Sequence, residues 1–342
     1  MNKTSLIIAA ALAVCSCGGN QHKADDPLAD TGRTQRTESL LTNLMAIGDS
    51  SSWLFGHQDA TVRGVGWEAD FNSDSTVHQR SDVKSVCNDH PALIGFDLGG
   101  IEHGNDKNTD GVPFSRIRQE AIAHFGRGGM VTLSWTVDST DKSEADIDRV
   151  AQYLNTIETT YGVKVPILFR LRGAFTKALW QNVARRLKEK EVVNALYVYS
   201  SGAGADSDGQ KYMERYPGDD IIDILGIDCY CYADDDETTQ TADYAAKLDN
   251  SLTMLCRLAK EHKKAVALTE TGFDGIKTTD WWTRTLSPVL ARHHLSYALV
   301  WHNNTKHYFA PFPGQKSVSD FIRFYNDKQT LFLSDVNGLY RN

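Results

Sequence analysis

The sequence predicts an α/β protein built as a single-domain (β/α)8 TIM barrel, on three observations. Eight short apolar runs rich in strand-forming residues recur from residue 53 onward, and amphipathic stretches separate them. The runs are near-continuously apolar, which is typical of parallel strands covered by helices. No glycine-rich dinucleotide fingerprint or P-loop follows the first run, so a nucleotide-binding doubly wound sheet is the weaker alternative.

The predicted strands follow one another at about the length of one βα unit. They cover residues 53–58, 92–100, 130–135, 166–173, 194–202, 221–230, 265–272 and 297–304. Between them, stretches such as 146–160, 175–190 and 243–262 carry apolar residues at three- and four-residue spacing. This spacing predicts helices that pack one face on the sheet.

The first 37 residues have the pattern of an export signal and a tether. Residues 1–16 hold one lysine and a short apolar run, which is too short to cross a bilayer as a mature helix. The layout is similar to a bacterial lipoprotein signal, with Cys17 as the lipidation site and Cys15 as the alternative; a plain signal peptide is the other interpretation. Residues 17–37 are polar and aperiodic, which predicts a flexible tether, and the barrel is expected over 38–342.

A lipid anchor at Cys17 would make the chain an exported lipoprotein, bound to the membrane on the periplasmic or cell-surface face of a bacterial outer membrane. The formal charge is −8, and no basic block interrupts the acidic residues. This charge argues against a nucleic-acid or anionic membrane surface as partner. A monomer that binds a neutral polysaccharide or oligosaccharide is expected, and no motif requires a cofactor or a metal.

The functional site of a closed barrel lies at the carboxyl ends of its strands. Carboxylates, aromatic rings and hydrogen-bonding groups end most of the predicted strands, which is typical of a carbohydrate site. The residues at these ends are His57, Gln58, Asp59, Asp97, Glu102, Trp135, Asp138, Arg170, Arg172, Tyr199, Ser200, Asp228, Tyr230, Glu270, Trp301 and His302. The candidate substrate-binding residues among them are Trp135, Arg170, Asp228, Tyr230, Trp301, His302, Asp97 and Glu102.

Several motifs, in order and in register with the predicted strands, resemble glycoside hydrolase family 26, the β-mannanase family. They include WLFGHQDA, ALIGFDLGGIEHGN, GGMVTLSW, VPILFR, DILGIDCY, ALTETG and YALVW, and the similarity runs over residues 53–340. The resemblance implies a retaining mechanism with a carboxylate nucleophile and a carboxylic acid/base. It implies that Glu270 is the nucleophile, that Tyr230 contacts it, and that Trp301 is the aromatic floor beneath the reacting sugar.

The fourth strand departs from the family pattern. In the family, a motif like FR leads into a His-Glu pair, whose Glu is the acid/base, and then into an aromatic loop. Here Arg170 is followed by Leu171, Arg172, Gly173 and Ala174, and a helical pattern begins at once. The acid/base near Gly173 and Ala174 is therefore expected to be missing, with shortened loops after the third and fourth strands.

General acid catalysis contributes about 10²- to 10⁴-fold, so hydrolysis of β-mannan is expected to be impaired or lost while glycan binding remains. The alternative is an active retaining glycosidase with an altered substrate or with a relocated acid/base, for which Asp138, Glu102 and His302 are the candidates. A barrel kept as a surface scaffold is the third interpretation.

Overall fold

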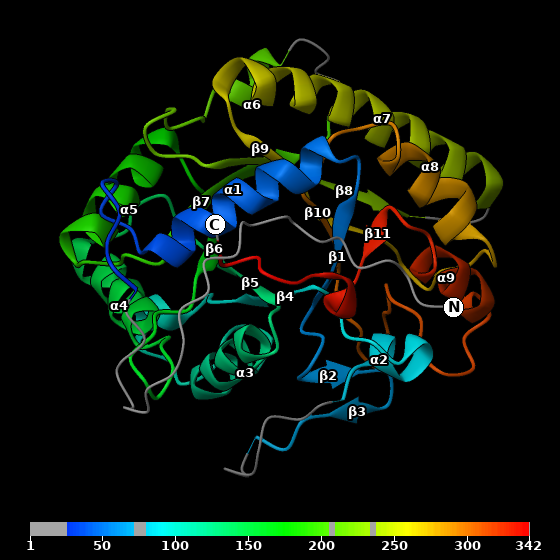
Figure 1. Cartoon of the computed structure of the whole chain (residues 1–342), viewed down its shortest axis with the longest axis horizontal. Helices are drawn as coiled ribbons and strands as arrows, with labels where there is room; N and C mark the ends of the chain where they lie inside the picture. The colour runs from blue at the N-terminus through cyan, green and yellow to red at the C-terminus, as the bar shows by residue number, and fades with distance from the viewer. Residues whose placement is uncertain (1–25, 72–79, 205–208, 233–236, 342) are drawn as a thin grey trace, which may run out of the picture.

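Eight parallel strands close into a barrel in the computed structural model, which describes residues 26–71, 80–204, 209–232 and 237–341 (Figure 1). The strand order is β10-β9-β8-β7-β6-β5-β4-β1, and β10 pairs with β1 to close the ring. All eight strands predicted from the sequence are present, so the prediction of a (β/α)8 barrel is confirmed.

The described elements follow in chain order. They are α1 (Gln35–Asp49), β1 (Trp53–Gln58), β2 (Arg63–Gly64), β3 (Trp67–Glu68), α2 (Asp82–Cys87), β4 (Leu93–Asp97), η1 (Ile101–His103), α3 (Phe114–Gly126), β5 (Met130–Val137), α4 (Glu144–Asn155), β6 (Ile167–Gly173), α5 (Lys177–Glu189), β7 (Ala195–Gly202), α6 (Gln210–Met213), β8 (Ile224–Cys231), α7 (Glu237–His262), β9 (Ala265–Phe273), η2 (Trp282–Leu286), α8 (Ser287–Leu290), β10 (Tyr297–Val300), α9 (Val318–Tyr325), β11 (Thr330–Leu331) and η3 (Leu333–Asp335).

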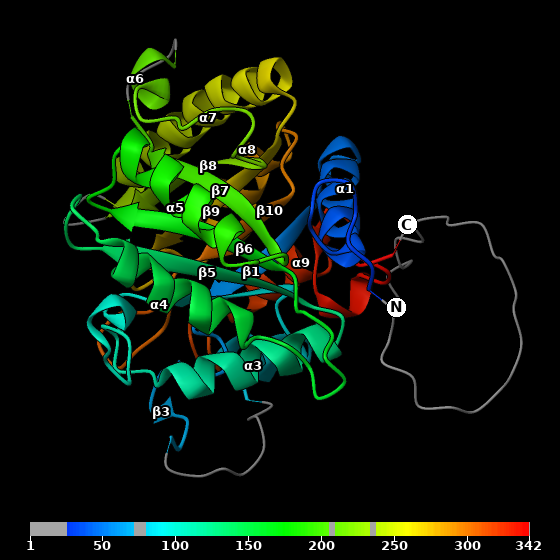
Figure 2. The same cartoon turned by 90° about the vertical axis from the view of Figure 1, so that its left-hand side faces the viewer.

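The amino-terminal helix α1 covers the end of the barrel opposite the expected site (Figures 1 and 2). Its Leu40, Leu44 and Ile47 are buried in one cluster with residues near the strand starts, such as Leu93 and Leu168. The hydroxyl of Ser296, just before β10, donates to the Leu44 carbonyl at 2.8 Å. Because α1 covers this end of the barrel, a ligand would reach the barrel from the carboxyl ends of the strands.

The folded part begins earlier than the sequence suggests. Helix α1 starts at Gln35, and Arg33 donates two hydrogen bonds of 2.8 Å to the carboxylate of Asp223. The described structure therefore includes part of the segment 17–37 that the sequence assigns to a tether. The Arg33–Asp223 ion pair attaches this part to the barrel. The predicted signal segment 1–16 and the predicted lipidation site Cys17 lie outside the described residues. Within the described ranges, no helix combines the length and hydropathy needed to cross a membrane.

The outer helices surround the strands (Figure 2), and they pack apolar side chains against them. Helix α5 begins where the hydroxyl of Thr176 accepts from the Leu179 amide at 3.1 Å. It buries Trp180, Val183 and Leu187, and the Trp180 ring meets Phe169 of β6 edge to face at 6.2 Å. A terminal cap and an apolar face thus place α5 directly behind β6.

The connection from β6 to α5 is very short, and Gly173 makes it possible. Gly173 has φ +77°, and a Cβ there would lie 2.5 Å from the Val137 carbonyl oxygen. The same carbonyl accepts from the Ala174 amide at 3.1 Å. The chain turns there toward Thr176, so only residues 174–176 separate the strand from the helix.

Replacing Gly173 with alanine should therefore destabilise the fold by more than backbone strain alone. The positive φ costs about 1 kcal/mol, and the contact with a backbone oxygen adds to it. Gly104 is the matched control, because it has φ +75° and no atom within 4 Å of an added Cβ. Urea unfolding should show a larger loss for Gly173→Ala than for Gly104→Ala. Equal losses would contradict the packing at this turn.

Candidate active site

Glu270 lies at the end of β9, where the sheet departs from regular pairing. The register between β8 and β9 shifts after Ile227, so that Asp228 is opposite Glu270, and a second shift separates β9 from β10 between Ala298 and Val300. A bulge of this kind re-aims a side chain next to an active site. The Glu270 side chain beside this bulge is buried.

Two guanidinium groups hold the Glu270 carboxylate. Arg172 Nε lies 2.6 Å from Oε1, and its Nη2 donates to Oε2 at 3.2 Å. Arg170 Nη2 pairs with Oε1 as well, and its Nη1 donates to Asp228 Oδ1 at 3.0 Å. Both arginines come from the inward face of β6, since residues two apart on a strand share a face.

Aromatic rings border this carboxylate. The Tyr230 hydroxyl donates to Glu270 Oε2 at 2.8 Å; burial, followed by the Glu270 charge, raises the pKa of Tyr230. The Tyr230 ring meets Trp301 edge to face at 6.5 Å and stacks on Tyr232 at 5.8 Å. Tyr232 is 68% exposed, so its ring extends the aromatic surface from the rim into solvent.

Arg172 lies over the face of Trp301. Its guanidinium carbon is 4.7 Å from the ring centroid, within the range of a cation–π contact. Nη1 donates to Thr136 Oγ1 at 3.3 Å and is 3.6 Å from Asp97 Oδ2. Arg172 therefore stands between the Glu270 and Asp97 carboxylates, above the ring that the sequence assigns to the sugar floor.

Two other carboxyl groups belong to this cluster. Burial raises the pKa of Asp228, although the Arg170 charge opposes the shift. Burial also raises the pKa of Asp97, against hydrogen bonding from Thr136 and the charge of Arg172. Three acids and two arginines thus share one desolvated site.

Trp135 and Glu102, both expected to bind substrate, lie beneath the rim. Trp135 is fully buried, because it alternates with the inward-facing Ser134 and Thr136 and so points toward the helices. Its Nε1 donates to Glu102 Oε2 at 3.0 Å. Lys142 Nζ lies 3.0 Å from Glu102 Oε1 and also pairs with Asp138. These side chains form a supporting layer, which corrects their expected role in contacting substrate.

The proposed substitutes for the acid/base do not face Glu270 either. Glu102 is engaged by Lys142 and Trp135, and Asp138 pairs with Lys142 and His103. His302 stacks beside Trp301 at 5.1 Å, and its Nδ1 points toward Asp59. Arg172 pairs with two described carboxyl groups, Glu270 and Asp97, and its guanidinium group lies between them.

The sequence indicated Glu270, Arg170, Asp228, Tyr230, Trp301 and Asp97, and the structure brings them together at the rim. The sequence did not indicate three features of the site. These are the position of Arg172 over Trp301, the hydrogen bond from Thr136 to Asp97, and the exposed ring of Tyr232. Strand parity was the available signal for Arg172 and Thr136, because both share the inward face of their strands with Arg170 and Ser134.

Comparisons with known proteins agree with this geometry. The family 26 glycosyl hydrolase model matches residues 140–264. The structure of a family 26 β-mannanase from Bacteroides ovatus is 39% identical, covers 91% of this chain and 98% of its own, and superposes with a TM-score of 0.82. The chain belongs to glycoside hydrolase family 26.

Two other relatives have lower sequence identity. A modular endo-β-1,4-mannanase from Cellulomonas fimi is 27% identical over 92% of this chain and 79% of its own, with a TM-score of 0.76. A mannan endo-1,4-β-mannosidase from Bifidobacterium adolescentis is 26% identical over 92% of this chain, which spans 36% of that relative's length. The family 26 fold and the resemblance of the motifs are thus confirmed.

Removing Lys142 should destabilise the layer beneath the rim. Lys142→Met would leave the buried Glu102 carboxylate without its cation, at a cost of about 3 kcal/mol in unfolding free energy. Lys190→Met is the control, because Lys190 pairs with Asp148 at 3.0 Å in a more exposed position. Chemical denaturation should give a loss below about 1 kcal/mol for the control. A Lys142 variant as stable as the control would refute this supporting role.

Proposed function

We propose that this family 26 protein engages β-mannan-type glycans at its rim but hydrolyses them poorly or not at all. The observation that carries this proposal is the path of β6, which passes from Arg172 through Gly173 into α5 and supplies no carboxyl group opposite Glu270. A sugar alkoxide is a poor leaving group unless a carboxylic acid protonates it.

The surroundings of Glu270 support the same conclusion. The Glu270 carboxylate accepts hydrogen bonds from two guanidinium groups and one phenol. These charge-assisted hydrogen bonds stabilise the carboxylate and so reduce its nucleophilicity. Attack on a sugar would first require Arg172 to leave, because it lies over Trp301. Loss of the proton source and occupation of the sugar floor both slow the reaction.

Retained glycan binding is supported by the aromatic surface. Trp301 and Tyr230 border Glu270, and Tyr232 extends the stacking surface outward. Flat rings beside hydrogen-bonding groups suit a neutral sugar chain. The mannanase names of the relatives favour a β-mannan-type chain over other neutral glycans.

Kinetics with two substrates should separate impaired from efficient hydrolysis. The rates of cleavage of mannohexaose and of a dinitrophenyl β-mannobioside are each compared with those of an active family 26 mannanase. The deficit should be at least about 10²-fold larger for mannohexaose, because the dinitrophenyl leaving group needs no proton. The active enzyme measured in parallel is the control. Rapid cleavage of mannohexaose would rule out the proposal.

Arg172→Ala should strengthen glycan binding by freeing the face of Trp301. Titration calorimetry with mannohexaose should show an affinity gain of about tenfold. This corresponds to the free energy of one cation–π contact, which the variant no longer has to break before the sugar binds. Arg215→Ala is the matched control, since Arg215 stacks over Phe175 at the same 4.7 Å but outside the Glu270 cluster. Weaker binding by Arg172→Ala would mean that Arg172 itself holds the sugar.

One observation favours an active glycosidase with a relocated acid. Asp97 lies across Arg172 from Glu270, and burial raises its pKa. If Arg172 swings away, Asp97 is the described carboxyl group placed to protonate a leaving oxygen. In that case Asp97→Asn would abolish mannohexaose cleavage and spare the dinitrophenyl substrate; under the favoured proposal, Asp97→Asn leaves the ratio of the two rates unchanged.

We also propose that the chain is an exported lipoprotein anchored through Cys17 on the outer membrane of its cell. The support is the amino-terminal pattern and the polar segment that follows it. Metabolic labelling with an alkynyl fatty acid tests this proposal, because Cys17→Ala should lose the label and Cys15→Ala should keep it.

A further inference from the structure

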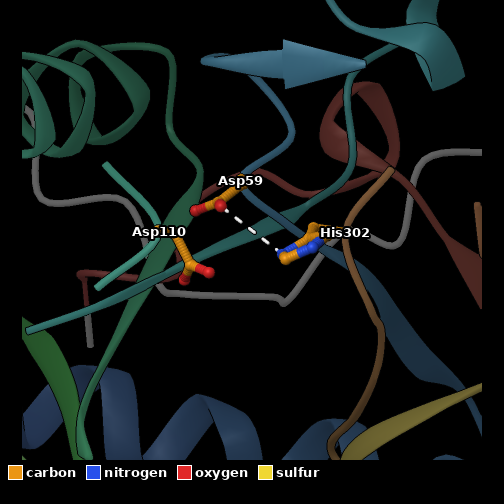
Figure 3. A group of neighbouring side chains, drawn as sticks. All are labelled: Asp59, Asp110 and His302. Atoms are coloured by element: carbon orange, nitrogen blue, oxygen red, sulfur yellow. Dashed lines mark ion pairs between the residues drawn. The ribbon is translucent and has the colours of Figure 1, made fainter. Parts of the chain in front are cut away.

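Three segments of the chain supply a second cluster of ionisable groups (Figure 3), and its His302 stacks on Trp301 of the Glu270 site. Asp59 follows β1, Asp110 lies in the connection between η1 and α3, and His302 follows β10. One possible ligand atom from each lies within 4.8 Å of the others. Asp59 Oδ2 and His302 Nδ1 are 3.6 Å apart and point toward one another.

Three side-chain atoms of this cluster, two on Asp59 and one on His302, lack hydrogen bonds among the described residues. Asp59 is fully buried, and among the described residues neither of its carboxylate oxygens has a hydrogen-bond partner; the same holds for His302 Nδ1. Arg63 Nε approaches Asp59 Oδ2 at 3.4 Å without forming a hydrogen bond. A buried carboxylate with no hydrogen bond is costly, which indicates that the site is built for a ligand.

A neighbouring cluster provides the contrast. Glu102, His103 and Asp138 also gather three possible ligand atoms, but there Lys142 Nζ hydrogen-bonds to both carboxylates. An ammonium group of the chain already fills that position. In the Asp59 cluster Arg63 forms an ion pair with Asp59 Oδ2 at 3.4 Å but no hydrogen bond to it, and its Nη2 donates to the Asp110 backbone carbonyl at 2.5 Å.

Backbone hydrogen bonds hold two of the three residues, Asp59 and Asp110, in place. Asp59 has a positive φ of 53°, and its amide donates to the Gly95 carbonyl at 2.9 Å. Asn108 fixes the loop of Asp110, because its side chain donates to the Asp97 carbonyl at 2.9 Å and accepts from the Asp110 amide at 3.1 Å. A preformed arrangement of this kind lowers the ordering cost of binding.

We propose that Asp59, Asp110 and His302 form a binding site for a divalent transition-metal cation of the Zn²⁺ class. Two carboxylate oxygens and one imidazole nitrogen suit such an ion, whereas Ca²⁺ and Mg²⁺ take oxygen ligands. Tetrahedral ligands at Zn²⁺ bond lengths lie about 3.3 Å apart, close to the separation of Asp59 and His302. Binding at Nδ1 places the ring proton on Nε2, which gives up a long 3.4 Å contact with Asn304.

The cation would also brace the sugar floor. His302 stacks on Trp301 at 5.1 Å, so a metal that fixes the imidazole fixes one side of that ring. The metal proposal does not rest on glycan binding or on hydrolysis, so each proposal can fail without the other.

Metal titration of the untagged full chain, freed of metal by chelation, tests the proposal. Co²⁺ should give the visible ligand-field absorption of a low-coordinate site at one equivalent, and Zn²⁺ should displace it. Asp110→Asn and Asp59→Asn should each weaken binding at least about tenfold. Asp138→Asn is the matched control, because it removes a carboxylate from the neighbouring cluster.

Circular dichroism identifies any variant that fails to fold, and the more exposed Asp110 keeps the test open if Asp59→Asn unfolds. The proposal is overturned if the folded wild-type chain takes up no metal. It is also overturned if folded Asp110→Asn binds as tightly as the wild type, or if the loss occurs in Asp138→Asn instead.

Discussion

The rim of this barrel is organised by the pairing of Glu270 with Arg170 and Arg172. The carboxylate is buried, and its negative charge is balanced by guanidinium groups from β6 and a phenol from β8. A buried charge of this kind persists only with hydrogen-bonded partners. Because Arg172 also contacts Trp301, Thr136 and Asp97, one side chain links Glu270 to the Trp301 ring and to the neighbouring strand.

The short connection after β6 explains why an arginine occupies this place. Gly173 turns the chain against the Val137 carbonyl, and α5 begins after residue 176, which leaves no length for a loop that could carry an acid over the site. The space opposite Glu270 is instead bordered by Arg172, the penultimate residue of β6. The barrel thus accommodates a very short connection at this point of the rim.

Much of this arrangement could be predicted from the sequence. Apolar runs gave the eight strands, and the polar residues ending them included those that meet at Glu270. The bulge in β9 left no signal in the residue pattern, and the position of Arg172 over Trp301 depends on three-dimensional packing. The place of Trp135 at a strand end favours the rim, whereas its parity along β5 directs the side chain to the helices, where it is buried. Asp110 was missed because it lies in a loop between strands.

Azide rescue tests the central claim most directly, namely that the nucleophile remains while its proton source is gone. Azide is a nucleophile that needs no general base, so it can release a glycosyl-enzyme formed on Glu270 when the acid/base is absent. With a dinitrophenyl β-mannobioside, the account predicts that azide accelerates turnover and that a β-mannobiosyl azide forms. Turnover unaffected by azide, together with efficient cleavage of mannohexaose, would contradict it.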